Sequence, residues 1–328
     1  MTQKIEPSAL RIREHCEAPA RCSTQTSGLT RIFLSDKQRA ANELVLQWMK
    51  EAGMSARLDA IGNAVGRYEG ERPGLSCLLL GSHLDTVRDA GKYDGMLGVV
   101  SAIECVHALN RRGKRLPFAI EVIGFADEGR RALQLDAARQ SRRGRHVRSG
   151  AARTRRRSRS VLAIEKRCAS EPELVGTVGS LETFPGATNV IPGKVVFTID
   201  IRAPKDEQRL AAVADVKAAI ESISAKRKVE TSITQVHEGK TAACAPWLME
   251  QIGEAIAAEG LPVRKLPSGA GHDGMALVGL TDIGMLFVRC ERGISHNPAE
   301  TISLEDAEIG ARVFLRFIEN FRPGKKRD

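Results

Sequence analysis

The stretch that decides the fold is residues 77–98, CLLLGSHLDTVRDAGKYDGMLG. Its first four residues form a short apolar run, which is typical of a buried strand. The run leads directly into Gly81-Ser82-His83-Leu84-Asp85. The glycine-containing turn at residues 95–98 then predicts the start of a helix that reaches about Leu109. A strand, a polar loop and a helix in this order indicate an α/β unit.

A second buried strand is predicted at residues 118–125, and it ends at Ala126-Asp127-Glu128. Upstream, Ser35 and Gln38 form a capping box that opens a helix as far as Gly53. Further strands are predicted at residues 56–61, 64–68, 174–183, 194–202, 229–236 and 284–289, and further helices at residues 207–224, 247–259 and 304–321. Strands that alternate with helices at these spacings predict an α/β fold.

The basic charge of the chain is concentrated in one segment. The 328 residues carry a net charge of +10, and residues 130–159 alone hold twelve Arg against one acid, Asp136. Residues 129–160 show no apolar period of a helix or a strand, so we expect them to be disordered. We interpret them as a frameshift plus a deletion, because out-of-frame reading of a GC-rich gene yields Arg, Ala, Ser and Gly. The alternative is a genuine basic insertion that binds nucleic acid or a membrane surface, but the segment has no aromatic residues for base stacking.

Several features concern the cellular compartment. Residues 1–23 contain no apolar region of a signal peptide, and no apolar run approaches the roughly 18 residues of a membrane helix. The seven cysteines form no C-x-x-C pair, which indicates reduced thiols. Cys77 and Cys290 lie in apolar runs and are interpreted as core residues. We therefore expect a cytoplasmic protein with no nucleic-acid or membrane partner.

Polar residues follow three of the predicted strands. His83 and Asp85 follow the first, Glu128 the second and His296 the third, while Asp94 lies in the loop before the helix that follows His83. Because ligands bind outside the carboxyl ends of strands in open α/β sheets, we expect these side chains to share a site. Imidazole and carboxylate ligands suit zinc, and manganese or cobalt is also tolerated.

The residue types suggest distinct roles. Asp85 is two residues beyond His83 on an extended chain, so it points the same way and is expected to orient the imidazole. A carboxylate such as Asp94 can bridge two cations, and one such as Glu128 can act as a general base. The glycine-rich loop at residues 268–274 either cradles an anion or is a simple tight loop.

The sequence resembles the family of N-carbamoyl-L-amino acid hydrolases and allantoate amidohydrolases, which are relatives of the co-catalytic zinc aminopeptidases. The matches cover most of the chain outside residues 129–160, and as a set they are specific. They are DAIGNAVG at residues 59–66, the stretch at residues 81–98, GFADE at 124–128, GTVG at 176–179, PGATNVIPG at 185–193, SGAGHD at 268–273 and GISHNPAE at 293–300.

The resemblance implies a zinc-aminopeptidase-like catalytic α/β domain, residues 1–128 and 242–328. It is interrupted by a ferredoxin-like lid and dimerisation domain, truncated here to residues 161–241. Two zinc or manganese ions per subunit and a homodimer are also implied. The implied residue roles are metal binding for His83, Asp94 and His296, with Asp94 bridging; catalysis for Glu128 and Asp85; and substrate binding for Asn189, Arg202 and His272.

The chain departs from the family pattern in its middle. The family usually has two consecutive Glu after the phenylalanine strand, whereas Glu128 is followed here by Gly129. A segment with a metal-binding His, and a lid segment of the Gly-His-Ala-Gly type, are both absent. We therefore expect an incomplete second metal site, doubtful dimerisation and weak or absent activity in the chain as written.

The implied reaction is hydrolysis of a linear amide or ureido C–N bond in a small carboxylate-bearing substrate, either allantoate or an N-carbamoyl-L-amino acid. The first alternative is a metallo-aminopeptidase or aminoacylase, but PGATNVIPG favours the carbamoyl and allantoate branch. The second alternative belongs to a different class, a non-catalytic metal-binding remnant.

Overall fold

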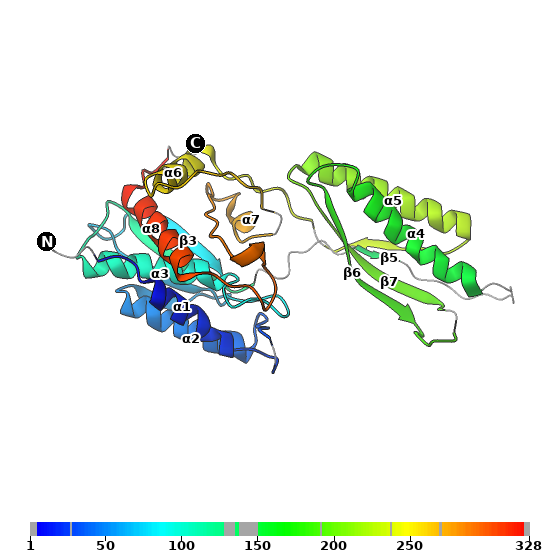
Figure 1. Ribbon diagram of the computed structural model, residues 1–328, viewed down its shortest axis with the longest axis horizontal. Helices are drawn as coiled ribbons and strands as arrows, with labels where there is room; N and C mark the ends of the chain where they lie inside the picture. Colours follow the sequence, from blue (N-terminus) through cyan, green and yellow to red (C-terminus); the bar gives the residue numbers. More distant parts are fainter. Residues whose placement is uncertain are drawn as a thin grey trace. The chain divides into compact units, whose positions relative to one another are not determined.

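The computed structural model describes residues 5–26, 28–127, 135–137, 150–190, 192–236, 238–268 and 271–324; of residues 135–137 and 150–158 it describes only the backbone. The chain divides into two compact units (Figure 1). Unit 1 comprises Met1–Arg130, Ala243–Lys265 and His272–Asp328, and unit 2 comprises Arg131–Ala242 and Leu266–Gly271. The functional names catalytic domain and lid domain remain predictions.

Unit 1 is built on a four-stranded sheet whose order is β1-β2-β4-β3. The strands are β1 (Ser55–Leu58), β2 (Ala64–Tyr68), β3 (Cys77–His83) and β4 (Ala119–Phe125). β3 and β4 are parallel, and their register pairs His83 with Phe125, so both strands end at the same level. His83 is therefore the last residue of its strand, and the chain that leaves β4 begins beside it.

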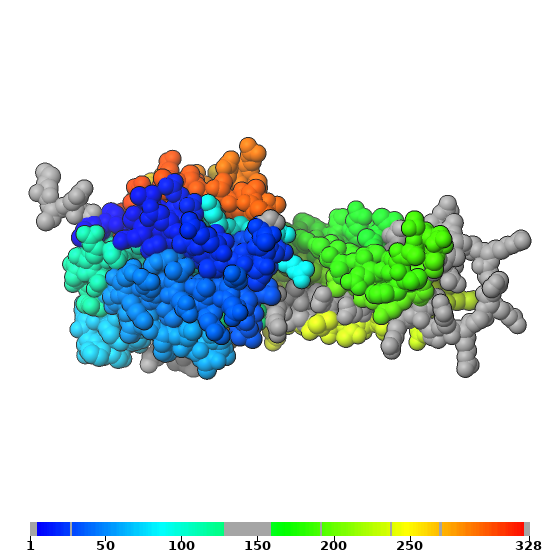
Figure 2. Space-filling model, turned by 90° about the horizontal axis from the view of Figure 1, so that it is seen from below, coloured from blue at the N-terminus to red at the C-terminus, as the bar shows by residue number. Residues whose placement is uncertain are grey.

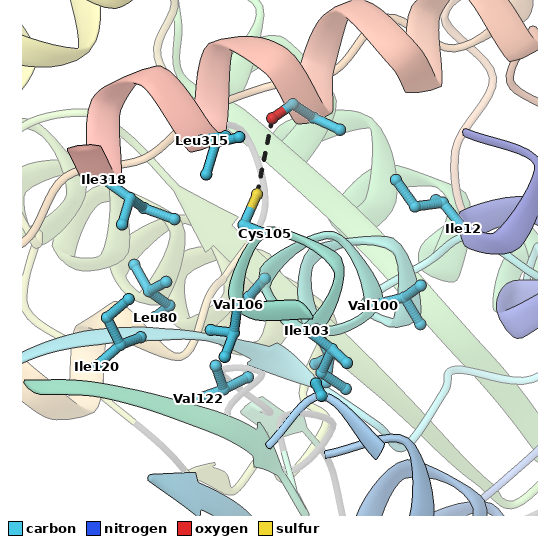
Figure 3. Close-up of a cluster of buried hydrophobic side chains, with 14 of the residues drawn as sticks. Ile12, Leu80, Val100, Ile103, Cys105, Val106, Ile120, Val122, Leu315 and Ile318 are labelled. Atoms are coloured by element: carbon cyan, nitrogen blue, oxygen red, sulfur yellow. Dashed lines mark hydrogen bonds between the residues drawn. The ribbon is translucent and has the colours of Figure 1, made fainter. Parts of the chain in front are cut away.

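Helix α3 (Met96–Arg111) connects β3 to β4 and forms the centre of the core. Eleven of its residues are buried, because its sides pack against the sheet and against other helices. Figure 3 shows α3 side chains among those of β3, β4, α1 (Ala9–Glu17) and α8 (Leu304–Asn320), and Cys105 Sγ lies 3.6 Å from the carbonyl oxygen of Ala311. Each buried aliphatic side chain contributes about 1.5–3 kcal/mol, so this packing fixes the helix that follows the loop of Asp94.

The remaining helices of unit 1 cover the outside of this core. α2 (Asp36–Glu51) begins as expected, with the Ser35 side chain accepting a hydrogen bond from the Gln38 N–H. Helix α1 was not predicted; only Ile12 and Cys16 of its nine residues are buried, which leaves little apolar period to detect. Figure 2 shows the dark-blue N-terminal residues at the surface of unit 1, beside orange C-terminal residues. The other elements are η1 (Pro19–Arg21), α6 (Pro246–Ala257), α7 (Gly274–Leu277) and η2 (Glu291–Gly293).

The strand predicted at residues 284–289 is wrong, because the described structure assigns no strand there. The segment is apolar because it packs against helices: side chains of Leu248 and Ile252 in α6 lie against Gly284, and Val288 lies against Gly310 in α8. The apolar pattern therefore predicted correctly that this segment packs against other elements. It could not show whether the backbone pairs with another strand. As a result, His296 follows an irregular segment and not a strand.

Unit 2 contains a long antiparallel hairpin of β6 (Val175–Phe184) and β7 (Lys194–Arg202). A second pair, β5 (Leu135–Ala137) and β8 (Ile233–Gln235), is also antiparallel. Helices α4 (Gly150–Cys168) and α5 (Asp206–Arg227) lie side by side in Figure 1, and they contribute Ile164, Val213 and Val216 to a core shared with Ile199 of β7.

Of the range 129–160, expected to be disordered, the structure describes residues 135–137 and 150–160, and these belong to strand β5 and to the beginning of helix α4 at Gly150. The prediction of disorder is therefore wrong for these parts. Arg and Ala have high helix propensity, so an Arg- and Ala-rich segment can be helical without an apolar face. The interpretation of this range as a frameshift remains a prediction.

The cysteines and the helices bear on the compartment. All seven cysteines are free. Cys77 is exposed, contrary to the core interpretation, because it begins the edge strand β3; Cys290 is only partly buried. Within the described ranges, the structure contains no helix whose length and apolar content would let it cross a membrane.

Candidate metal centre

His83 is held at the end of β3 by its own loop. Its Nδ1–H donates a hydrogen bond of 2.9 Å to the backbone carbonyl of Asp85. The carboxylate Oδ1 of Asp85 is 3.8 Å from the same nitrogen. We expected the Asp85 carboxylate to orient this ring, but the nearer acceptor is the Asp85 carbonyl. Because a carbonyl only accepts, this contact keeps a proton on Nδ1, so Nε2 is the nitrogen that can bind a cation once it is deprotonated.

The loop that carries Asp94 passes directly against the His83 ring. Gly95 has a left-handed φ of 66°, and a Cβ atom there would lie 2.4 Å from the His83 carbonyl oxygen and 2.5 Å from its Nδ1. Only glycine fits both the conformation and the space. This close approach brings Asp94 Oδ1 to 3.4 Å from His83 Nε2.

Asp94 lies between two imidazole rings. Its Oδ1 is 3.4 Å from His83 Nε2 and 3.9 Å from His296 Nε2, and its side chain is only 9% exposed. Its Oδ2 is buried without a hydrogen-bond partner. Burial raises the pKa of Asp94, but the hydrogen bond and charge of His83 and the charge of His296 outweigh burial and hold that pKa below its usual range. The carboxylate is thus ionised and has one oxygen available for a cation.

His296 is held less firmly than His83. It lies on a loop, its side chain is 46% exposed, and its φ of 54° is in the left-handed region that favours glycine. Its backbone N–H donates a hydrogen bond of 3.1 Å to Oε2 of Glu300, a buried residue. The pKa of Glu300 is raised above its usual range by burial and by the charge of Asp94, and the hydrogen bonds from His296 and Ser295 offset this only in part.

The donor types and their spacing can be compared with a bound ion. Two ligands at about 2.1 Å from a tetrahedral zinc lie about 3.4 Å from each other. The His83–Asp94 distance of 3.4 Å fits this spacing, whereas the His296–Asp94 distance of 3.9 Å is longer. Accordingly, the part of the chain that the structure describes contains no group of three His, Cys, Asp or Glu side chains arranged closely enough to hold a metal ion. His83 and Asp94 have the spacing of two ligands of one ion, and His296 Nε2 lies about half an ångström farther from Asp94 Oδ1 than this spacing.

The other predicted site residues are not all placed. Glu128 lies outside the described residues. His272 precedes α7, its Nδ1 is buried without a hydrogen-bond partner, and burial lowers its pKa. Arg202 Nε donates a hydrogen bond of 2.7 Å to Asp200, and Asn189 is exposed in the β6–β7 loop.

Asn189 and Arg202 lie toward opposite ends of the hairpin. The register pairs Phe184 with Lys194 beside the loop of Asn189, and pairs Val175 with Arg202 at the far end. Arg202 is eight residue steps along β7 from Lys194, which corresponds to about 26 Å of strand. The structure therefore does not bring these two side chains together within one chain.

Three residues near the centre were not predicted from the sequence. Arg31 is 1% exposed, and its guanidinium donates hydrogen bonds to the carbonyls of Leu84 and Pro19 at 2.7 and 2.9 Å. Glu300 and Gly91 contact each other beside His296 and Asp94. Gly91 and Glu300 both lie within matched stretches, but nothing in their local sequence indicated that they contact each other.

Comparison with known proteins was made by sequence and by structure. A family model described as peptidase family M20/M25/M40 matches residues 79–320. An N-carbamoyl-L-amino-acid amidohydrolase of Pseudomonas sp. (strain NS671) is 28% identical over 401 aligned positions, covering 94% of this chain and 97% of the relative. Allantoate deiminase 1 of Glycine max is 30% identical, covering 89% of this chain and 85% of the relative.

A solved structure shows the same fold. The hydantoinase/carbamoylase family amidase of Burkholderia multivorans has a TM-score of 0.80 and 24% identity, covering 97% of this chain and 98% of the amidase. The 401 aligned positions with the Pseudomonas relative exceed the 328 residues of this chain, so that relative contains several tens of residues without a counterpart here.

Proposed function

Because the chain belongs to peptidase family M20/M25/M40, we propose that it is built to hydrolyse a linear amide or ureido C–N bond in a small carboxylate-bearing substrate. Relatives named N-carbamoyl-L-amino-acid amidohydrolase and allantoate deiminase support these two substrate classes. The observation that carries the proposal is the position of Asp94 between His83 and His296, with one buried oxygen lacking a hydrogen-bond partner.

Metal dependence is general in this family, and we propose zinc or manganese held by His83, Asp94 and His296. A bound divalent ion would polarise the substrate carbonyl and lower the pKa of a water molecule. The free Oδ2 of Asp94 supports a bridging role toward a second ion. The missing second Glu and the missing His predict that this second ion is held weakly.

The chain's own residues supply orientation and proton transfer. The Asp85 carbonyl fixes the His83 tautomer. We assign the general base to Glu128, which would take a proton from the attacking water and deliver it to the leaving nitrogen. Arg202 and Asn189 are suited to a substrate carboxylate, since a guanidinium and an amide both donate hydrogen bonds to carboxylate oxygens.

The hairpin register leads to a proposal about the assembly. About 26 Å of strand separates Arg202 from the loop end, so Asn189 and Arg202 can hold one carboxylate only if they come from two copies of the chain. We propose a homodimer on this ground. Mixing the N189A and R202A variants tests it, because a mixed dimer would contain one intact composite site and recover roughly a quarter of wild-type turnover or allantoate binding. No recovery after proven subunit exchange would contradict the proposal.

The seven free cysteines support a reducing compartment such as the cytoplasm. The alignment with the Pseudomonas relative is longer than this chain, which supports a deletion, and we place that deletion at the Arg-rich segment, residues 129–160. Resequencing the gene around codon 129 tests the frameshift: a second Glu and a His-containing segment in the corrected text would support it. Confirmation of the printed sequence would favour the non-catalytic remnant.

The main experiment combines metal analysis with ammonia release. We expect about one tightly held divalent ion per chain, and ammonia release from allantoate or N-carbamoyl amino acids that is weak for the chain as written and strong for a frame-restored version. The D94N variant is the matched control and should lose the ion. An ion content well below one per chain in the wild type would contradict the proposed site.

A further inference from the structure

The His296 loop contains a conformation that needs support from its surroundings. His296 has a φ of 54°, which residues other than glycine rarely adopt. Such backbone positions persist only where neighbouring contacts hold them. The neighbouring contacts therefore decide where this proposed ligand is placed.

The contact that holds His296 comes from Glu300. Glu300 Oε2 accepts the hydrogen bond from the His296 N–H at 3.1 Å. The intervening chain forms a tight turn, because Glu300 N–H donates to the Asn297 carbonyl and Ala299 N–H donates to Asn297 Oδ1, both at 2.9 Å. The turn brings the Glu300 carboxylate back to the start of its own loop.

Glu300 also lies against the loop that carries Asp94. A Cβ atom at Gly91 would be 2.4 Å from Glu300 Cβ, and 2.8 Å from its Cδ and Oε2. Only a residue without a side chain at position 91 allows this approach. Glu300 is 8% exposed, so the contact is buried, and Gly91 is three residues before Asp94.

We infer that Glu300 is a positioning residue that joins the two segments carrying the metal ligands Asp94 and His296, with Gly91 as the surface on which it lies. That Asp94 and His296 are metal ligands rests on the proposed function. The contacts themselves are present whether or not an ion is bound. A carboxylate that only filled space would not need to accept the His296 N–H.

The test compares E300A with E300Q in the full chain. The first readout is amide hydrogen exchange at His296 in metal-stripped protein, which needs neither metal nor activity. The second is Zn²⁺ affinity, measured by competition with a chelator. E300A removes the acceptor and should lower both the exchange protection, by roughly tenfold, and the Zn²⁺ affinity, by about 10–100-fold. E300Q keeps an acceptor oxygen and should stay close to wild type in both. The E291A variant, at an exposed acid in the same region, is the control and should change neither.

A second pair of variants tests the surface on which Glu300 lies. G91A should displace Glu300 and reproduce the changes of E300A, whereas G279A should not, because a Cβ atom there meets open space. Thermal unfolding identifies any variant that fails to fold. If E300A or G91A does not fold, E300Q is still compared with wild type in both readouts.

Three results would overturn the inference: wild-type exchange and affinity in E300A, equal losses in E300Q and E300A, or wild-type behaviour of G91A. A wild-type chain without Zn²⁺ affinity would instead contradict the proposed function, and the exchange data would still decide the role of Glu300.

Discussion

The two ends of the candidate centre hold their histidines in different ways. His83 ends a strand that is paired with β4 along its whole length, its ring nitrogen is hydrogen-bonded, and its side chain is 11% exposed. His296 follows an irregular segment, has a left-handed backbone and is 46% exposed. Sheet pairing orders His83 whether or not an ion is bound, whereas His296 depends on a few contacts within its loop. The difference places the adjustable half of the site at His296.

The largest effect is expected where the two halves meet, at Asp94. The D94N variant removes the charge that faces both imidazoles, and a divalent ion contributes several kcal/mol to transition-state stabilisation, so we expect a loss of about 10³-fold or more in kcat/KM. Steady-state ammonia release from the frame-restored chain would measure it. Retention of both ion and activity would show that the two histidines do not meet through Asp94.

A crowding variant addresses the His83 half. G95A places a Cβ atom within 2.4–2.6 Å of the His83 carbonyl and ring, at a positive φ. Overpacking costs about 1–3 kcal/mol, so we expect the free energy of unfolding to fall by at least this amount. Urea unfolding of the metal-free chain measures it, with G279A as a control that should differ little from wild type. An unchanged midpoint for G95A would mean that the His83 half adapts as easily as the His296 half.

The difference in stability between a glycine and an alanine variant should have opposite signs at the two histidines. At His296 the left-handed conformation costs an L-residue about 1–2 kcal/mol, so H296G should be more stable than H296A by about 1 kcal/mol. At His83, in an extended strand, H83G should be less stable than H83A by about 0.5–1 kcal/mol. Denaturant unfolding of the four variants gives both differences. The same sign at both positions would remove the distinction between strand and loop.

The smallest effect concerns a histidine that we assign to packing. His15 stacks on Trp48 with ring centroids 4.0 Å apart, and burial lowers its pKa. Below about pH 6.5 the unfolded chain therefore binds more protons than the folded chain, so stability falls as the pH drops through this range. Urea unfolding at pH 7.5 and 5.5 should show a smaller decrease in H15F, which keeps a stacked ring. An equal decrease in both proteins would assign the pH dependence to other groups.

Much of the fold could be predicted from the sequence, because its signals are local. The alternating burial of β7 marks the same residues, 194–202, that the sequence predicts, and Ser35 caps α2 as expected. The mixed α/β fold itself is confirmed by the solved relatives. The strand predicted at residues 284–289 was wrong for a physical reason. Its apolar side chains are buried by helices, but a strand also requires a backbone that pairs with a neighbouring strand.

The site was predictable in outline and not in detail. A strand end pointed to His83, and the family motifs pointed to His83, Asp94 and His296. The structure places both imidazoles near Asp94 Oδ1, although the strand expected before His296 is absent and the role of the three residues as ligands remains a prediction. The sequence could not show that the nearer acceptor for His83 is the backbone carbonyl of Asp85. The carbonyl and the carboxylate of Asp85 are both two residues from His83 in the chain, and only the folded loop decides which one is closer. Nor could it show the role of Gly95, which depends on a close approach to a ring twelve residues away.

The fit between Gly91 and Glu300 has a consequence for sequence variation. The two positions lie about two hundred residues apart in the chain, yet there is no room to enlarge one without reducing the other. In an alignment of relatives, a side chain at position 91 should therefore coincide with a shorter residue at position 300. Substitutions at these two positions would then be compensatory, and each alone would be selected against.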